Sequence, residues 1–83
     1  MELKDTIKLM TSDDYRERFK AEYYQLKIRT GKLHSLLAKM DADELNFKPT
    51  CPRVVLERQL HSMLDYLSEL AFRADLEGIT LED

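Results

Sequence analysis

The sequence predicts an all-α protein in which a short N-terminal arm precedes an antiparallel hairpin of two long helices. Two observations carry this prediction. The 83 residues include only two Gly and two Pro, which is typical of helices and not of a turn-rich sheet protein. Apolar residues also recur at intervals of three and four along two long stretches, as they do on the buried face of an amphipathic helix. At this length, residues 1–83 are expected to form a single helical domain.

The N-terminal arm is expected over residues 1–10. Leu3, Ile7 and Met10 stand at i, i+4 and i+7, the spacing of a short amphipathic helix. A helix of this length is marginal on its own. The stretch "TSDD" then marks a strong helix start, because residue 11 or 12 can accept backbone N–H bonds and the two aspartates suit the positive end of a helix dipole.

The first long helix is expected over residues 13–40, a length of about 42 Å at about 1.5 Å per residue. Its apolar residues are Tyr15, Phe19, Tyr23, Leu26, Leu33, Leu36, Leu37 and Met40. Their spacing of threes and fours has one gap, at Arg29 and Thr30. Gly31, the poorest helix former in the stretch, lies beside that gap, so we expect a kink or a close approach of another segment there.

Residues 41–52, "DADELNFKPTCP", are expected to connect the two helices, because acidic residues, Asn and Pro are typical of connections. Leu45 and Phe47 are the apolar residues of this linker, and we expect both to pin it to the core. Its last residues prepare the next helix: Thr50 or Cys51 is the expected cap, and Pro52 suits the first turn.

The second helix is expected over residues 52–77. Its apolar residues repeat in a regular 4-3-4-3-4 pattern. They are Leu56, Leu60, Met63, Leu67, Leu70 and Ala74. Gly78 is placed to end the helix, with Ile79 as the hydrophobic contact just beyond it, and the residues after that are expected to fray.

The second helix carries more apolar side chains than one hairpin seam can bury. The surplus consists of Val55, Leu64, Tyr66, Ala71 and Phe72. Because large unpartnered apolar faces are usually covered, we expect another copy of the chain to pack there and form a homo-oligomer.

Several classes of protein and site are disfavoured. One Cys allows no internal disulfide, and it supplies too few zinc ligands together with two His that are 27 residues apart. His34 and His61 on different helices could form a metal or catalytic pair, but partly exposed helix histidines are the simpler interpretation. Cys51 at a helix start could be reactive, and a passive capping or core Cys is again simpler. We predict no enzyme, no cofactor, no membrane span and no signal peptide, and therefore a soluble cytoplasmic protein.

The charge distribution is the main functional signal. The chain has a formal net charge of -3, yet residues 16–39 contain seven Lys or Arg against two acidic residues, and the rest contains six against 14. One interpretation is a solvated face neutralised by acidic residues of the second helix. The alternative is an anion site. Lys27, Thr30 and His34 stand at i, i+3 and i+7 and share a helix face, as do Arg29 and Lys32.

Three tyrosines on the same helix, at positions 15, 23 and 24, could stack on a base or bond a phosphate. Long nucleic acid is a poor fit, because an acidic domain with few phosphate contacts would gain little from counterion release. A small phosphorylated ligand needs only a few local cations, so the residues favour a pocket.

Two stretches carry a resemblance to a known family: "YRERFKAEYYQLKIRTGKLHSLL" and "ERQLHSMLDYLSELAFRADLEGI". The shared features are the spacing of Arg18, Glu22 and Leu26, the "GKL" of residues 31–33, and a frame in the second helix. The frame consists of Gln59, Met63, Tyr66, Leu70 and Arg73. Over residues 13–78 the chain thus resembles the small helical bacteriophage proteins that include the phage anti-CBASS cyclic-oligonucleotide sponges.

The resemblance implies immune evasion by a helical homohexamer that binds cyclic dinucleotides, and in some members cyclic trinucleotides at a separate site, without cleaving them. Family members contact ligand through a tyrosine, a lysine, a threonine and an arginine. Lys32 and Arg73 match the lysine and the arginine, and Tyr15 is the nearest tyrosine. His34 stands at the threonine position, where Thr30 is the alternative.

Two other functions are alternatives, and the second of them fits the residues less well. A small helical adaptor or inhibitor could bind a host protein through the apolar face of the second helix. A structural coiled coil of a virion would need longer uninterrupted heptads than the gap beside Gly31 allows.

Overall fold

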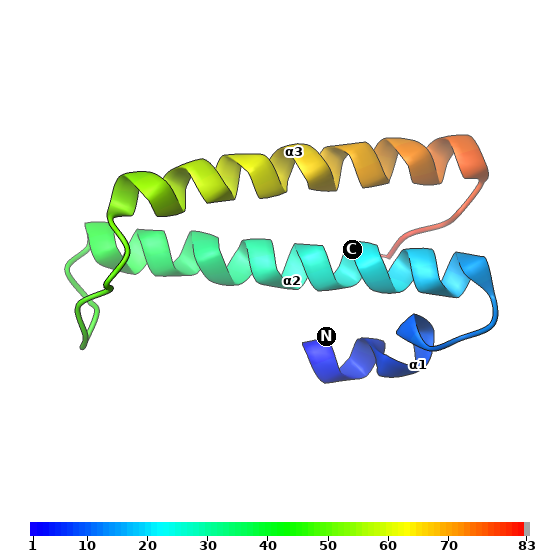
Figure 1. The fold of residues 1–83 in the computed structure, drawn as a ribbon, viewed down its shortest axis with the longest axis horizontal. Helices are drawn as coiled ribbons and strands as arrows, with labels where there is room; N and C mark the ends of the chain where they lie inside the picture. The colour runs from blue at the N-terminus through cyan, green and yellow to red at the C-terminus, as the bar shows by residue number, and fades with distance from the viewer. Residues whose placement is uncertain (83) are drawn as a thin grey trace.

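The computed structural model describes residues 1–82, and over that range it contains helices and no strands. A 3-10 turn, η1 (Leu3–Thr6), runs directly into the one-turn helix α1 (Ile7–Met10), and two long helices follow, α2 (Tyr15–Asp41) and α3 (Arg53–Glu77). Figure 1 shows α2 and α3 side by side and antiparallel, with the arm of η1 and α1 along another side of α2. The expected all-α arrangement of a short arm and two long helices is confirmed.

The start of α2 lies two residues later than expected. Asp14 is the cap, and its carboxylate accepts a hydrogen bond from the backbone N–H of Arg16 at 2.9 Å. The hydroxyl of Ser12 accepts from the N–H of Asp14 at 3.0 Å. Ser12 thus accepts a backbone N–H bond, as expected of residue 11 or 12, and it orients Asp14, which is the capping residue of the helix.

The middle of α2 continues as helix through Gly31 (Figure 1). No atom outside the local helix backbone lies within 4 Å of the place where a Cβ would stand on Gly31, so the expected close approach was wrong. Thr30 fills the gap in the apolar stripe instead. It is buried, and its hydroxyl donates to the carbonyl of Leu26 at 2.7 Å, which satisfies the polar atom inside the helix.

The start of α3 also differs from the expectation. Pro52 is the residue before the helix and not part of its first turn, and its carbonyl accepts from the N–H groups of Val55 and Leu56 at 3.1 and 3.3 Å. No side chain caps this end, so the capping role expected of Thr50 or Cys51 was wrong.

The end of α3 follows the expectation for a glycine stop. Gly78 has a φ of 68°, in the left-handed region, and the N–H of Ile79 donates to the carbonyl of Ala74 at 2.9 Å. Ile79 is buried. Residues 80–82 fold back over α2 and do not show the expected fraying: Leu81 packs on the core and the N–H of Glu82 donates to the Tyr24 hydroxyl at 3.0 Å. Residue 83, also expected to fray, lies outside the described residues.

The core consists of two clusters along the hairpin. The aromatic cluster contains Phe19, Tyr23, Tyr24, Leu70, Ala74 and Ile79. The leucine cluster contains Leu33, Leu37 and Leu60. Every apolar residue expected on the seam of α3 is buried or half-buried in or against these clusters.

Five side chains depart from the expected core and surface. Ile7 and Met10, expected on the apolar face of the arm, are exposed. Phe47 is 57% exposed and does not pin the linker. Tyr15 is exposed although it continues the apolar spacing of α2, and Ala71 packs against the aromatic cluster although it was expected to be surplus. The other four surplus residues of α3 are exposed. Within residues 1–82 no helix combines the length and the apolarity that a membrane crossing requires.

Candidate functional site

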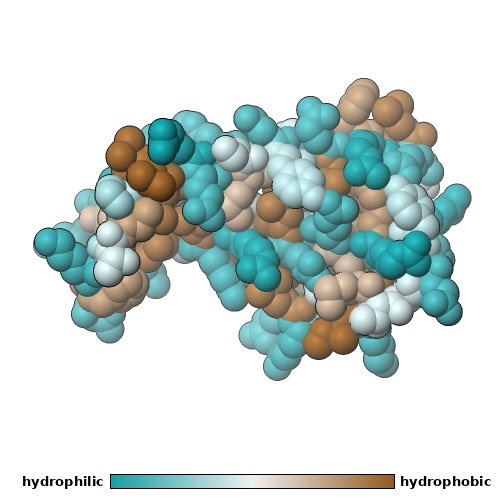
Figure 2. All heavy atoms as spheres, in the orientation of Figure 1, coloured by the Kyte–Doolittle hydropathy of each residue, from teal (hydrophilic) through white to brown (hydrophobic). Residues whose placement is uncertain are grey.

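The face of α2 away from α3 carries an open hollow of about 640 Å³. Its floor is one side of α2, and its walls are Met1 of the arm and Leu45 and Phe47 of the linker. We call it the basic hollow, lined by Met1, Lys27, Ile28, Gly31, Lys32, Ser35, Leu36, Lys39, Leu45 and Phe47. Figure 2 shows the molecule hollowed on the side between the arm and the linker.

Among residues 1–82, three lysines and no acidic residue line the basic hollow. The ammonium group of Lys27 lies 6.0 Å from the centre of the Tyr23 ring. Lys32 and Lys39 stand seven residues apart on one face of α2, and among the described residues neither has an ion-pair partner. No residue of α3 lines the hollow, so its acidic side chains do not neutralise these two lysines as the first interpretation expected. At Lys32 and Lys39 an anion would meet positive charge that no ion pair within the described part of the chain neutralises.

A second polar group joins the start of α2 to the end of α3. The Tyr15 hydroxyl donates to Oε1 of Glu77 at 2.7 Å and accepts from Nη2 of Arg73 at 3.1 Å. Nε of Arg73 lies 3.4 Å from Oε2 of Glu77, and its guanidinium stacks over Phe19, 5.0 Å from the ring centre. The hydrogen bond to Glu77, followed by desolvation, raises the pKa of Tyr15 above its ordinary 10.0. Tyr15 and Arg73 thus lie together, and both contact the carboxylate of Glu77.

The remaining predicted ligand residues lie elsewhere. Thr30 is buried with its hydroxyl bonded inside α2, and Arg29 is exposed outside the lining of the basic hollow. His34 lines a different, smaller hollow together with His61. The structure therefore does not bring Lys27, Thr30 and His34 to one site, although their spacing places them near one helix face.

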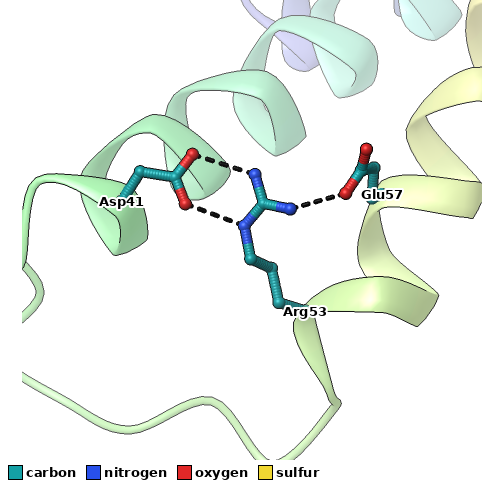
Figure 3. Close-up of polar contacts among 3 residues, drawn as sticks. All are labelled: Asp41, Arg53 and Glu57. Atoms are coloured by element: carbon teal, nitrogen blue, oxygen red, sulfur yellow. Dashed lines mark hydrogen bonds and ion pairs between the residues drawn. The ribbon is translucent and has the colours of Figure 1, made fainter.

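The linker end of the hairpin holds an ion-pair group that the sequence analysis missed. Nε and Nη2 of Arg53 donate to the two carboxylate oxygens of Asp41 at 2.8 and 2.9 Å, and Nη1 donates to Glu57 at 2.5 Å (Figure 3). These bonds lower the pKa of Asp41 below its ordinary 3.8. Because both carboxylates occupy the guanidinium, Arg53 closes the hairpin and is not available as an anion-binding group. Opposite charges at the two ends of a short linker were the signal that could have revealed it.

Comparison with known proteins identifies the family of the chain. The family model described as Sequestin matches residues 13–76, which is more than half of the chain. The chain belongs to the Sequestin family. Sequestin is the phage anti-CBASS cyclic nucleotide sponge family, and it is a family of binding and sequestering proteins rather than of enzymes. No curated protein and no solved structure matches the chain significantly.

The Sequestin match spans α2 and nearly all of α3, and it leaves the arm outside. It therefore includes Tyr15, Arg73 and the three lysines of the basic hollow, whereas Glu77 and Met1 lie outside it. Tyr15 and Lys32 stand 17 residues apart on α2, which is about 25 Å along a helix axis. One small ligand cannot touch both of them on a single protomer.

Two residues that line the basic hollow of this Sequestin member were not among the predicted ligand residues. Lys39 was counted in the basic stretch but was not named as a ligand residue, and Ser35 was not considered. Their places seven and three residues after Lys32 were the available signal, because both spacings return to nearly the same helix face. Glu77 was considered only as an acidic neighbour and not as a partner of Tyr15.

Proposed function

We propose that this Sequestin member is a non-enzymatic sponge that binds cyclic dinucleotide or trinucleotide immune signals of the infected cell and withholds them from their effector. The observation that supports it is the basic hollow. Within residues 1–82, three lysines gather there without an acidic side chain, and Lys32 and Lys39 have no ion pair. Phosphate groups bind strongly to such ammonium groups through charge-assisted hydrogen bonds. The protein would act in the host cytoplasm, where these signals are made.

The proposed ligand site is shared between copies of the chain. A cyclic dinucleotide carries two phosphates related by approximate two-fold symmetry, and a two-fold interface offers each phosphate the same side chains. The separation of about 25 Å between Tyr15 and Lys32 supports this division, because contacts from both would have to come from different protomers. We propose a homohexamer, in which the exposed apolar residues of α3, such as Val55, Leu64 and Phe72, are covered.

The proposed contacts fall into two sets. Lys27 and Lys32 of the basic hollow would hold phosphate, with Lys39 as an addition from the structure. Tyr15 and Arg73 would act together at the other end of the hairpin. Arg29, Thr30 and His34 remain predictions from the sequence, and the burial of Thr30 makes it the least accessible of them.

The decisive test is calorimetric titration of the purified protein with a panel of cyclic dinucleotides and trinucleotides, followed by recovery of the ligand from denatured protein. Intact recovered ligand would establish sequestration without cleavage. The variant Lys32→Glu should lower the affinity at least about a hundredfold, because it replaces an attraction for phosphate by a repulsion.

Lys8→Glu is the matched control, since Lys8 is exposed on the arm, outside the lining of the basic hollow. It makes the same charge change and should leave the affinity within about twofold. Helical circular dichroism and the mass of the assembly should stay unchanged in both variants. Equal losses in the two variants would contradict a local site.

A second candidate function is an adaptor that binds a host protein through α3. The 59% exposure of Phe72 favours it, together with the exposed Tyr66, whose hydroxyl is already bonded to Glu22. An adaptor should bind no cyclic nucleotide and should tolerate Lys32→Glu.

A further inference from the structure

Glu77 already occupies an anion-binding arrangement made by two other residues. One of its carboxylate oxygens accepts from the Tyr15 hydroxyl at 2.7 Å, and the other lies 3.4 Å from Nε of Arg73. The two donors come from opposite ends of the chain, since Tyr15 begins α2 and Arg73 lies near the end of α3. A phenol and a guanidinium that converge on both oxygens of one carboxylate would also suit two oxygens of a phosphate.

The two donors are held in place by contacts that do not involve Glu77. The Arg73 guanidinium stacks on Phe19, whose own ring is only 2% exposed and belongs to the aromatic cluster. Nη2 of Arg73 also donates to the Tyr15 oxygen at 3.1 Å. Removal of the Glu77 charge therefore leaves the pair of donors with its own support.

The Glu77 carboxylate and its two donors can be reached from solvent. Tyr15 is 46% exposed, and the side chains of Arg73 and Glu77 are 47% and 35% exposed. An ion pair between residues i and i+4 on a solvated helix face is weak. A phosphate carried by a ligand with further contacts elsewhere can therefore displace this carboxylate.

We propose that Glu77 is an internal competitor that fills the phosphate position between Tyr15 and Arg73 until a ligand phosphate displaces it. The inference rests on the proposed function and adds a specificity-determining residue to it. A lone inorganic anion gains too little at this exposed pair to replace a tethered carboxylate. A cyclic oligonucleotide gains more, because its other phosphates reach further cations at the same time.

The variant Glu77→Gln tests this role, because the amide keeps the size of the side chain and removes its charge. Calorimetric titration with cyclic di-AMP and cyclic GMP–AMP should show affinities about three- to tenfold higher than for the unmodified protein. The matched control is Glu69→Gln, the same change on an exposed position of α3 where the described residues form no ion pair. The control should stay within about twofold.

The outcomes separate this inference from the proposed function. If the unmodified protein binds a probe and loses it in Lys32→Glu, while Glu77→Gln binds equally well or more weakly, Glu77 is not a competitor and the sponge function stands. If neither the unmodified protein nor Glu77→Gln binds any cyclic nucleotide, both proposals fail. If Glu77→Gln binds a cyclic nucleotide and the unmodified protein binds none, the Glu77 carboxylate competes strongly enough to exclude the ligand.

Discussion

The two ends of the hairpin differ in the number of segments that pack together there. At one end the arm, α2, α3 and the C-terminal tail all contribute to the aromatic cluster, with Leu9 of the arm and Leu81 of the tail packed against it. At the other end only α2 and α3 form the leucine cluster, and Arg53 joins Asp41 and Glu57 across the surface. The arm thus covers one half of α2, and the basic hollow opens where that cover stops.

The candidate site therefore depends on which part of α2 the arm leaves uncovered as much as on which residues are present. Arg53 and Lys32 are both exposed cations near the linker end. Arg53 is held by two carboxylates, whereas Lys32 has no ion pair among residues 1–82. Exposure alone would make both residues equal candidates for binding an anion. The ion pairs identify Arg53 as a structural cation and leave Lys32 as the candidate ligand contact.

The largest expected effect compares the two clusters directly. Leu70→Ala should lower the free energy of unfolding by about 3–4 kcal/mol, because Leu70 is 1% exposed and its neighbours cannot close the cavity. Leu60→Ala should cost about 2 kcal/mol, since the leucine cluster is thinner and nearer to solvent. Urea denaturation followed by circular dichroism gives both values at a fixed protein concentration. Equal costs would mean that the two ends are equally well packed.

A smaller effect is expected on the floor of the basic hollow. Gly31→Ala should stabilise the protein by about 1 kcal/mol, because a Cβ at Gly31 meets no atom within 4 Å and alanine is the better helix former. The melting temperature should rise by about 4–8 °C. Ser35→Ala is the control on the same floor. It should raise the melting temperature less, because serine is already a better helix former than glycine. A fall in the melting temperature of Gly31→Ala would show that the space above Gly31 is filled in the assembled protein.

The smallest effect concerns the ion pair at the linker end and depends on pH. The folded-state pKa of Asp41 lies below its ordinary 3.8, so its contribution to stability is full above that value and disappears as the pH falls through the lowered folded-state pKa. Asp41→Asn should therefore melt slightly lower than the unmodified protein at neutral pH, and the difference should vanish at the acid end of a series of melts.

Asp65→Asn provides the control for that series, because the described residues form no ion pair with Asp65. The difference in melting temperature between Asp65→Asn and the unmodified protein should not disappear as the pH falls. A constant deficit for Asp41→Asn across the series would mean that the Arg53 bonds do not depend on the charge of Asp41.

Much of the hairpin could be predicted because its signals are local. The spacing of Leu56, Leu60 and Met63 indicated the seam of α3, and Gly78 followed by Ile79 indicated its end. The predictions failed where two local solutions compete. Asp14 and Ser12 are both good capping residues, and Pro52 is acceptable on either side of a helix start.

The candidate site was predictable only as a region. A run of basic residues indicated an anion site on α2, and Lys27 and Lys32 do line the basic hollow. Helical spacing also grouped Lys27 with Thr30 and His34. Spacing predicts which residues share a helix face, but it does not predict which segment of the chain packs on that face. Packing buried Thr30, whose hydroxyl is bonded within α2, and left His34 in another hollow.

By itself, the sequence determined the helical class, the two long helices and the concentration of positive charge on the first of them. Each follows from neighbours within a few residues, where helix propensity and periodicity act. Only the tertiary structure decided that Tyr15 meets Glu77 and that Asp41 meets Arg53, because these partners lie 62 and 12 residues apart in the chain. It also left the lysines of the basic hollow facing away from α3, since the aromatic and leucine clusters fixed which side of α2 had to be buried.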